Sequence, residues 1–371
     1  MSTERAPRHG WVEWLESRMR LTELFSFFTH FGLVYTPIDT TRPMREVIRL
    51  LGSQRIPRYD RWPHVLGPLM AVLFGLEVFT GLLLSYYYQP SSGDAFASAR
   101  TIVRDLPFGW FLHQMHTWGS YALVAVVALR LLRLFWDGLW RAPREVLWCS
   151  AVAATWLALQ ADFTGRLLVW DTHSYWSVVR GLEVVFALPV AGPMLSFLLG
   201  GRVITDHLLI RFYILHIVVL PLLFAATMYA TFATLRRVGL SAPEGRTVPT
   251  TTHREYLFSL VRFNLVLFAG LVTLAVLAPL PFFGIADPYT TPANVRPPWY
   301  MLSPWLISEK LPVPVWLTGS VLLAIAIAVL LMPLWARGKG IAEERRIRLA
   351  GTLLLAVWVA LTVAGALVGR K

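Results

Sequence analysis

The chain is poor in cysteine and in charged residues. Cys149 is its one cysteine among 371 residues. A single thiol excludes a disulfide within the chain, an iron–sulfur cluster held by the chain's own thiolates and a CxxCH attachment motif, so we expect Cys149 to be a packed thiol. Charged residues make up 15% of the chain, against about 25% in a typical soluble domain. This shortage argues against a protein that is surrounded by water.

Other familiar signals are missing as well. The sequence contains no glycine-rich nucleotide fingerprint and no pattern of a soluble catalytic triad. Its N-terminus lacks the short apolar core and the small-residue cleavage site of a signal peptide. Instead, Trp11, Trp14, Leu15 and Met19 alternate with charged neighbours. This pattern predicts an amphipathic helix that lies on the inner membrane surface, with a disordered tail as the alternative.

Long apolar runs are abundant. Hydrophobic residues make up 56% of the chain, and they fall into blocks of about 20 residues, the length at which a helix crosses about 30 Å of hydrocarbon. The expected spans are 64–88, 110–135, 146–169, 208–233, 258–283, 314–336 and 348–368. The sequence therefore predicts an all-α integral membrane protein with seven transmembrane helices.

The placement of positive charge predicts the orientation. The first 62 residues carry ten Arg, and further Lys and Arg lie in the loops after the second, fourth and sixth spans. Because such residues accumulate on the cytoplasmic side, we expect a multi-pass protein of the bacterial cytoplasmic membrane with its N-terminus inside. The net charge of +12 then reflects topology and membrane lipid. It does not indicate a nucleic-acid partner, because the basic residues flank apolar spans.

Two histidines stand inside predicted spans. His116 and His216 each lie near the outer end of a span, where a histidine is costly unless it faces the bundle interior or a cofactor. A packed interface histidine is the alternative. Glycines favour the cofactor, because Gly67 and Gly81 are fourteen residues apart on one helical face and Gly165 lies near the outer end of the third span. Missing Cβ atoms allow a flat macrocycle to approach the backbone.

Four stretches are more specific: GDAFASARTIVRDLPFGWFLHQMHTWGS (93–120), FTGRLLVWDTHSYW (163–176), IRFYILHIVVLPLL (210–223) and DPYTTPANVRPPWY (287–300). They resemble the cytochrome b family of quinol-oxidising bc-type complexes, most closely its cytochrome b6 branch, over about residues 10–340. The resemblance implies a cytoplasmic N-terminal segment (1–62), a haem-binding four-helix bundle (63–240) and a subunit-IV-like region of three helices (241–371).

The family holds two stacked haems, and the elements of the outer haem match this chain. The resemblance assigns the axial iron ligands to His116 and His216, the close-packing glycines to Gly81 and Gly165, and a place near the propionates to Arg211. Where the family has an arginine three residues before the first ligand, this chain has His113. That side chain either donates to a propionate or faces solvent.

The elements of the inner haem depart from the family pattern. Arg130 and Thr231 replace the two inner histidines, Ala151 replaces one glycine, and Gly67 alone remains. We therefore expect one haem b, on the outer side. A guanidinium stays protonated and cannot ligate iron in the ordinary way, so we expect the Arg130 stem to fill the old pocket while its head reaches lipid phosphate or water. The alternative is that Arg130 binds an anionic cofactor or a quinone head group.

The quinone site departs from the family as well. The family's Pro-Glu-Trp-Tyr turn is here Pro297-Pro298-Trp299-Tyr300, so the carboxylate that would take the quinol proton is absent and a general base is missing. Glu77, Asp287 and Glu309 are other candidate proton carriers. A carboxylate midway through a span is costly, and the structural alternative for Glu77 is a protonated residue that is hydrogen-bonded to a neighbouring helix.

Two functions remain open from the sequence. In the first, the chain is a one-haem redox subunit that exchanges electrons between quinol or quinone and a partner with c-type haem or iron–sulfur centres. In the second, it is a non-catalytic, degenerate cytochrome b that anchors other subunits, so whether the chain is part of an enzyme stays open.

The two haem positions of the family would lie about 21 Å apart along the helices. A chain with only one haem is therefore not expected to bifurcate electrons across the membrane. The apolar surface suggests an assembled state, with a homodimer as one form.

Overall fold

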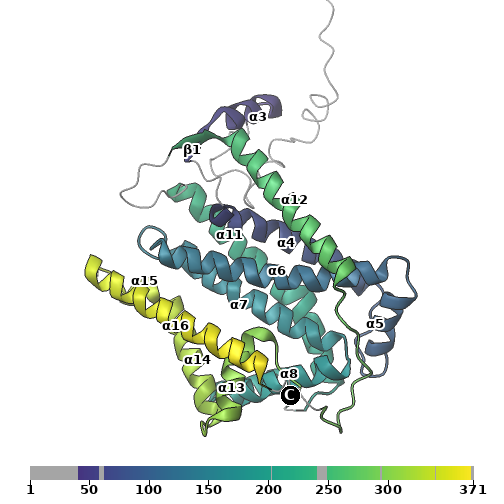
Figure 1. Cartoon of the computed structure of the whole chain (residues 1–371). Helices are drawn as coiled ribbons and strands as arrows, with labels where there is room; N and C mark the ends of the chain where they lie inside the picture. The colour runs from purple at the N-terminus through teal and green to yellow at the C-terminus, as the bar shows by residue number, and fades with distance from the viewer. Residues whose placement is uncertain are drawn as a thin grey trace, which may run out of the picture.

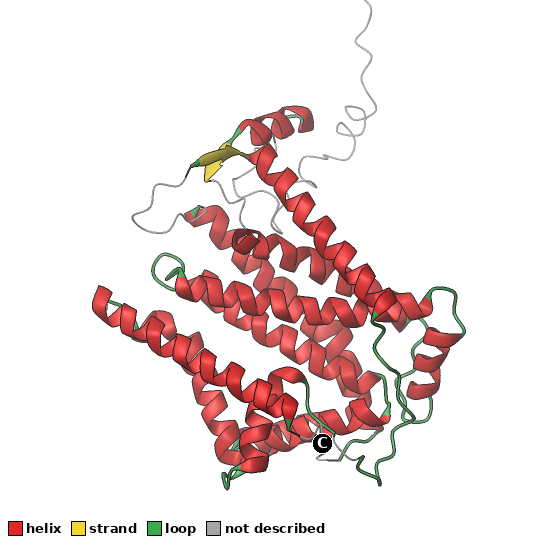
Figure 2. Ribbon diagram, in the orientation of Figure 1, coloured by secondary structure: helices red, strands yellow, loops and turns green. Residues whose placement is uncertain are grey.

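The structure is a computed structural model, and it describes residues 41–57, 62–201, 203–239, 249–292, 295–338 and 340–368. The amphipathic helix expected near the N-terminus lies outside these residues. The described chain is almost entirely helical, with one small two-stranded sheet (Figure 2). The expected all-α class is confirmed.

Four long helical segments lie side by side and form the bundle (Figure 1). They are α4 (Trp62–Ser85), α6 (Gly109–Trp136), α7 (Glu145–Leu168) and one continuous segment made of α10 (Asp206–Ile214), the π-helix η1 (Leu215–Val219) and α11 (Leu220–Val238). Helix α6 packs between α4 and α7, and α7 packs against α11. Stacking of Phe74 on Phe224, with ring centroids 4.8 Å apart, joins α4 to α11 and closes the bundle.

Three long or apolar helices follow in the C-terminal part. They are α12 (His253–Leu277), α14 (Val315–Leu330) and α16 (Ile341–Leu367), with the short α13 (Leu302–Lys310) and α15 (Met332–Trp335) between them. Six helices of the described chain are long and apolar enough to cross a membrane. The span expected over 314–336 is instead a 16-residue helix and a short one, separated at Leu331. The count of seven spans is therefore not confirmed.

The ends of α12 differ from the expected 258–283 for local reasons. The helix begins at His253 because Thr252 and Glu255 form a capping box, in which each side chain binds the other residue's backbone N–H. It ends at Leu277 because Pro279 and Pro281 follow, and a proline disfavours helical backbone before it and removes a donor. Hydrophobicity alone did not mark these boundaries.

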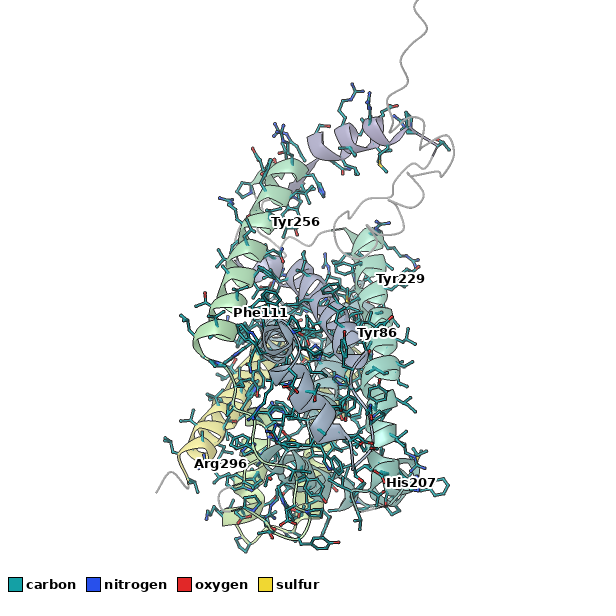
Figure 3. All side chains as sticks on the ribbon, turned by 90° about the vertical axis from the view of Figure 1, so that its right-hand side faces the viewer. Tyr86, Phe111, His207, Tyr229, Tyr256 and Arg296 are labelled. Atoms are coloured by element: carbon teal, nitrogen blue, oxygen red, sulfur yellow. The ribbon has the colours of Figure 1, made fainter. Side chains whose placement is uncertain are left out.

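Short elements cover the two ends of the bundle. At one end, α3 (Met44–Ser53) and β1 (Arg55–Pro57) lie beside β2 (Thr250–Thr252), which pairs antiparallel with β1. At the other end lie α5 (Ala95–Arg104), α8 (Thr172–Phe186) and α9 (Ala191–Leu199) (Figure 1). We call the end with α5 and α8 the outer end, after the orientation expected from the charges. In Figure 3, His207 at the start of α10 and Arg296 lie toward the same end of the molecule.

The segment after α12 is fastened to the outer end of the bundle. Asp171, which is buried, accepts the backbone N–H of Ser174 at 2.7 Å as the N-cap of α8 and that of Phe283 at 3.2 Å. On α6, the Gln114 amide donates to the carbonyl of Leu280 and accepts its N–H. These bonds hold the chain that leads to the 297–300 turn against α6 and the start of α8.

We expect Asp171→Ala to lower the melting temperature of the detergent-solubilised protein. The change removes a helix cap and leaves two part-buried N–H groups without their acceptor, a loss of about 1–3 kcal/mol. Thermal unfolding followed by circular dichroism measures the effect. Asp105→Ala, at an exposed carboxylate after α5, is the matched control and should leave the melting temperature unchanged; equal melting temperatures for the two variants would contradict the prediction.

Candidate functional site

The rings of His116 and His216 face each other at the outer end of the bundle. Their centroids are 6.1 Å apart and their planes are 83° from parallel. A histidine nitrogen binds a metal at about 2 Å, so two rings that hold one iron between them have centroids about 6 Å apart. The described residues hold no group of three or more His, Cys, Asp or Glu side chains that suits a metal ion, but a haem iron needs only two protein ligands. This pair fits such an iron.

Hydrogen bonds determine which ring nitrogen of His216 can bind a metal. Its Nδ1 lies 3.0 Å from the carbonyl oxygen of Ala161 and 3.4 Å from the Thr164 hydroxyl. A carbonyl can only accept, so Nδ1 carries the hydrogen and Nε2 keeps its lone pair for a metal. A metal-binding histidine commonly has its second nitrogen held in this way.

The same arrangement occurs at His116. Its Nδ1 lies 2.9 Å from the Thr80 hydroxyl and 3.1 Å from Glu77 Oε2. The Thr80 hydroxyl donates its own hydrogen to the carbonyl of Leu76 at 2.7 Å, so its oxygen accepts the Nδ1–H of His116. Both imidazoles are therefore held with Nε2 free to ligate.

Two of the predicted glycines lie directly against these rings. A Cβ atom at Gly81 would lie 3.2 Å from His116 Cε1, and one at Gly165 would lie 2.6 Å from His216 Cε1. Real Cβ contacts are essentially never shorter than 3.0 Å. Glycine at 165 therefore gives the His216 ring the room that any other residue would fill.

A local irregularity of the helix carries His216. Residues 215–219 form a π turn, in which the N–H of Leu220 binds the carbonyl of Leu215. Pro221 follows and has no N–H to offer the carbonyl of Ile217. Such single π turns are common at functional sites. The sequence showed the proline and the histidine, but the spacing alone did not reveal the wider turn.

Glu77 is held in the bundle by its neighbours on α6. Besides the contact of Oε2 with His116, its Oε1 is buried without a hydrogen-bond partner among the described residues. A Cβ at Gly119 would lie 2.1 Å from that oxygen, so the absence of a side chain at 119 makes room for the carboxylate. The structure contains the contact of Glu77 with a neighbouring helix, and its role as a proton carrier stays a prediction.

The two residues expected near the haem carboxylates lie in different surroundings. The His113 ring packs edge-on against Phe282 with centroids 6.1 Å apart, and its Nδ1 is buried without a partner among the described residues. A buried ring nitrogen without a partner suits a carboxylate ligand. Arg211 is exposed, and its guanidinium lies against Gly200, where a Cβ would be 2.0 Å from Nη1.

At the opposite end of the bundle, Arg130 occupies the level of the expected inner site. The residue is only 5% exposed, its Nη2 donates to the Thr231 hydroxyl at 3.4 Å, and that hydroxyl lies 2.9 Å from the hydroxyl of Ser150. Its Nε would be 4.0 Å from a Cβ at Gly67. The expectation that the head of Arg130 reaches lipid or water is wrong, because the whole side chain lies inside the bundle.

A polar cluster that no sequence motif marked lies beside the 297–300 turn. The Tyr300 hydroxyl donates to Asp162 Oδ2 at 2.8 Å, and Arg166 Nε donates to the same oxygen at 2.9 Å. Pro297 and Pro298 are buried, whereas Trp299 is 45% exposed. No motif marked Asp162, because its partner Tyr300 is 138 residues away in the chain.

Two pKa values outside the spans are shifted in opposite directions. Burial and the neighbouring Asp162 carboxylate raise the pKa of Tyr300 above its usual range, so the phenol keeps its proton. The Thr290 hydroxyl and the Tyr289 backbone N–H lower the pKa of Asp287 by hydrogen bonding to its carboxylate. A carboxylate with a lowered pKa is a weaker base, which makes Asp287 a poor proton carrier.

A cavity of about 230 Å³ lies beside the segment that leads to the turn. Its lining includes Arg180, Arg296, Glu309 and Lys310. The Arg296 guanidinium is held by the carbonyl of Ala366 in α16, at 2.7 Å. Glu309, the third candidate proton carrier, is one of the residues that line this cavity.

Comparison with known proteins gives one consistent result. A family model described as cytochrome b/b6/petB matches residues 53–239, and one described as cytochrome b(C-terminal)/b6/petD matches 285–371. The chain is 36% identical to a cytochrome b6 of Heliobacterium modesticaldum over 181 residues, which are 48% of this chain and 85% of the relative. It is 31% identical to a cytochrome b6 of a Synechococcus species over 211 residues, 57% of this chain and 97% of the relative.

The fold has a solved counterpart. A structure described as a hyperthermophilic respiratory Complex III has a TM-score of 0.75 with this chain at 23% sequence identity. The alignment covers 96% of this chain and 91% of that chain. At this level of identity the likeness shows a shared fold.

We expect Gly165→Ala to disrupt the outer histidine pair, because the added Cβ would lie 2.6 Å from the His216 ring. Gly67→Ala is the matched control, since its Cβ would meet nothing closer than 4.0 Å. Haem per polypeptide in the purified proteins, from the pyridine haemochromogen spectrum, measures the difference. The Gly165 variant should lose most of the haem and the Gly67 variant should retain it; the reverse result would contradict the geometry.

Proposed function

The chain belongs to the cytochrome b/b6 family, and we propose that it is a one-haem electron-transfer subunit in which His116 and His216 hold haem b near the outer face. Membership of the family implies a haem cofactor and membrane electron transfer. The number of haems, their position and the electron donor are our proposal. The apolar helices agree with a multi-pass membrane protein.

One contrast within the bundle carries this proposal. At the outer level, two imidazoles face each other at 6.1 Å, with glycines against both rings. At the inner level, the corresponding volume contains the Arg130 side chain, hydrogen-bonded to Thr231 and buried. A guanidinium stays protonated and has no lone pair for iron. The donor set therefore supports one haem rather than two.

The bound group would supply reversible one-electron chemistry, and the chain's own residues would set its surroundings. His116 and His216 would ligate through Nε2, while Thr80 and the Ala161 carbonyl hold the opposite nitrogens. His113, with its buried Nδ1, would donate to a haem carboxylate. Arg211, which is exposed five residues before His216, would provide positive charge at the outer edge.

The electron donor and acceptor follow from the location. We propose that quinol or quinone exchanges electrons with this site beside the Pro297–Tyr300 turn, which the segment after α12 brings to the outer end. A partner subunit with c-type haem or iron–sulfur centres would exchange electrons along the outer face. Because one outer haem leaves about half of the ~30 Å core without a carrier, the chain would not bifurcate electrons across the membrane by itself.

The topology and the division of the chain are part of the same proposal. The N-terminal segment (1–62) lies on the cytoplasmic side of a bacterial membrane, the bundle (63–240) holds the haem, and the C-terminal region (241–371) completes the quinone site. A homodimer is one assembly in which the lipid-facing helices would find partners. The basic residues of the first 62 positions support this orientation.

We expect one haem b per polypeptide in the purified protein. His116→Ala and His216→Ala should each lose it, because the remaining imidazole would supply only one of the two protein ligands that the iron needs. Arg130→Gln, which removes the charge at the inner level, is the control and should keep one haem. The pyridine haemochromogen spectrum and the protein concentration give the ratio.

A ratio of haem to polypeptide other than one would contradict the proposal. Two haems per chain would contradict the claim that Arg130 and Thr231 abolish the inner haem site. No haem in the wild-type protein, with the fold intact by circular dichroism, would favour the non-catalytic scaffold instead.

A further inference from the structure

The 297–300 turn has no carboxylate of its own, but the structure supplies one from another helix. The hydroxyl of Tyr300, the last residue of the turn, donates to Asp162 Oδ2 at 2.8 Å. Asp162 lies on α7, near its outer end, and its side chain is only 4% exposed. A buried carboxylate is therefore in hydrogen-bond contact with the turn that would bind the quinol.

We propose that Asp162 is the proton acceptor for a quinol at this turn, reached through the Tyr300 hydroxyl. This inference rests on the proposed function, because it needs a quinol at the turn. The quinol O–H bond breaks and its proton passes to Tyr300 Oη. The Tyr300 O–H bond breaks at the same time, and its proton forms a new O–H bond with Asp162 Oδ2. The quinol is left as its anion, the form that the one-electron acceptor of the proposed function then oxidises.

Asp162 is paired with a cation and hydrogen-bonded on both of its carboxylate oxygens. Arg166 donates to Oδ2 through Nε at 2.9 Å and to Oδ1 through Nη2 at 3.3 Å, and the Ser120 hydroxyl donates to Oδ1 at 3.1 Å. An isolated buried charge is strongly unfavourable, but a paired and hydrogen-bonded one is tolerated. Asp162 is thus held in place on both oxygens, with Oδ2 in contact with the Tyr300 hydroxyl.

Arg166 is itself fixed in position. Its Nη2 donates to the Tyr121 hydroxyl at 3.0 Å, and its guanidinium lies 5.2 Å from the centre of the Tyr121 ring. The cation therefore stays when Asp162 becomes neutral. The other titratable groups whose charges act on or are influenced by Asp162 are Glu77 on α4 and His216.

Tyr300 suits a relay better than it suits a base. A phenol hydroxyl is both donor and acceptor, so Oη can receive one proton while it passes its own to Asp162. Burial and the neighbouring carboxylate keep the phenol protonated, which leaves Asp162 as the group that ends with the proton. The relay also lies next to the haem site, because the residue before Asp162, Ala161, binds Nδ1 of His216.

The test compares Asp162→Asn, Tyr300→Phe and the double variant with the wild-type protein, all haem-loaded and in detergent. Stopped-flow absorbance follows haem reduction by decylubiquinol and, in parallel, by a short-chain menaquinol, from pH 5.5 to 9. Loss of a positioned base costs about 100-fold in rate or more. Because both residues belong to one relay, we expect similar losses in the two single variants and no further loss in the double variant.

The pH dependence separates the relay from a structural role. Without the relay only quinol that is already deprotonated reacts, so the variants' rates should rise about tenfold per pH unit, whereas the wild-type rate should change much less. Asp162→Asn leaves Arg166 buried without its carboxylate and can impair folding. Tyr300→Phe keeps the Asp162–Arg166 pair, so the proposal remains testable through this variant alone.

Two kinds of control show that each variant keeps an intact site. Haem content and full reduction by dithionite report the state of the haem site. Glu183→Gln, at an exposed outer-end carboxylate that pairs with Arg180, should match the wild type.

The outcomes separate the relay from the quinol function. If the wild type is reduced by quinol but Tyr300→Phe and Asp162→Asn keep its rate and pH dependence, the relay is wrong and the quinol function stands. Losses that add in the double variant also contradict a single relay. If neither quinol reduces a wild type that dithionite reduces, the quinol function is wrong and the relay with it.

Discussion

The apolar surroundings of the bundle make a partner inside the protein strongly favourable for a polar side chain, because lipid offers none. The contacts of the outer level follow from this constraint. His216 bonds the Ala161 carbonyl, and Asp162 bonds Arg166, Ser120 and Tyr300. The same constraint explains the inner level, where the Arg130 guanidinium turns to Thr231 inside the bundle.

The two levels of one bundle therefore differ in chemistry while they share a backbone. Helices α4, α6, α7 and the α10–α11 segment pass through both levels. The outer level presents two lone-pair donors and two glycines, and the inner level presents a permanent cation. Under the proposed function, this difference would limit the electron path to the outer half of the membrane, so that electrons would leave to a partner on that side.

The C-terminal region is connected to this outer level by a small number of polar contacts. Asp171 and Gln114 hold the segment after α12 against the start of α8 and against α6, and Tyr300 reaches Asp162 from the turn that follows. The proposed haem site and the proposed quinone site thus share one helix, α7. Adjacent residues of that helix, Ala161 and Asp162, contact His216 and the turn, which would allow electron and proton transfer to occur side by side.

The sequence by itself determined the helical class and where most of the long apolar helices lie, because hydrophobic length is a local property, although it predicted seven spans and the described residues contain six such helices. The resemblance to the family supplied the pairing of His116 with His216. It also identified the positions that distinguish the inner level, Arg130 and Thr231. Only the tertiary structure decided where these side chains point and what they meet: the burial of Arg130, the π turn at His216 and the Asp162–Tyr300 bond. Those contacts join residues far apart in the chain, and their geometry depends on how helices pack, which no local pattern encodes.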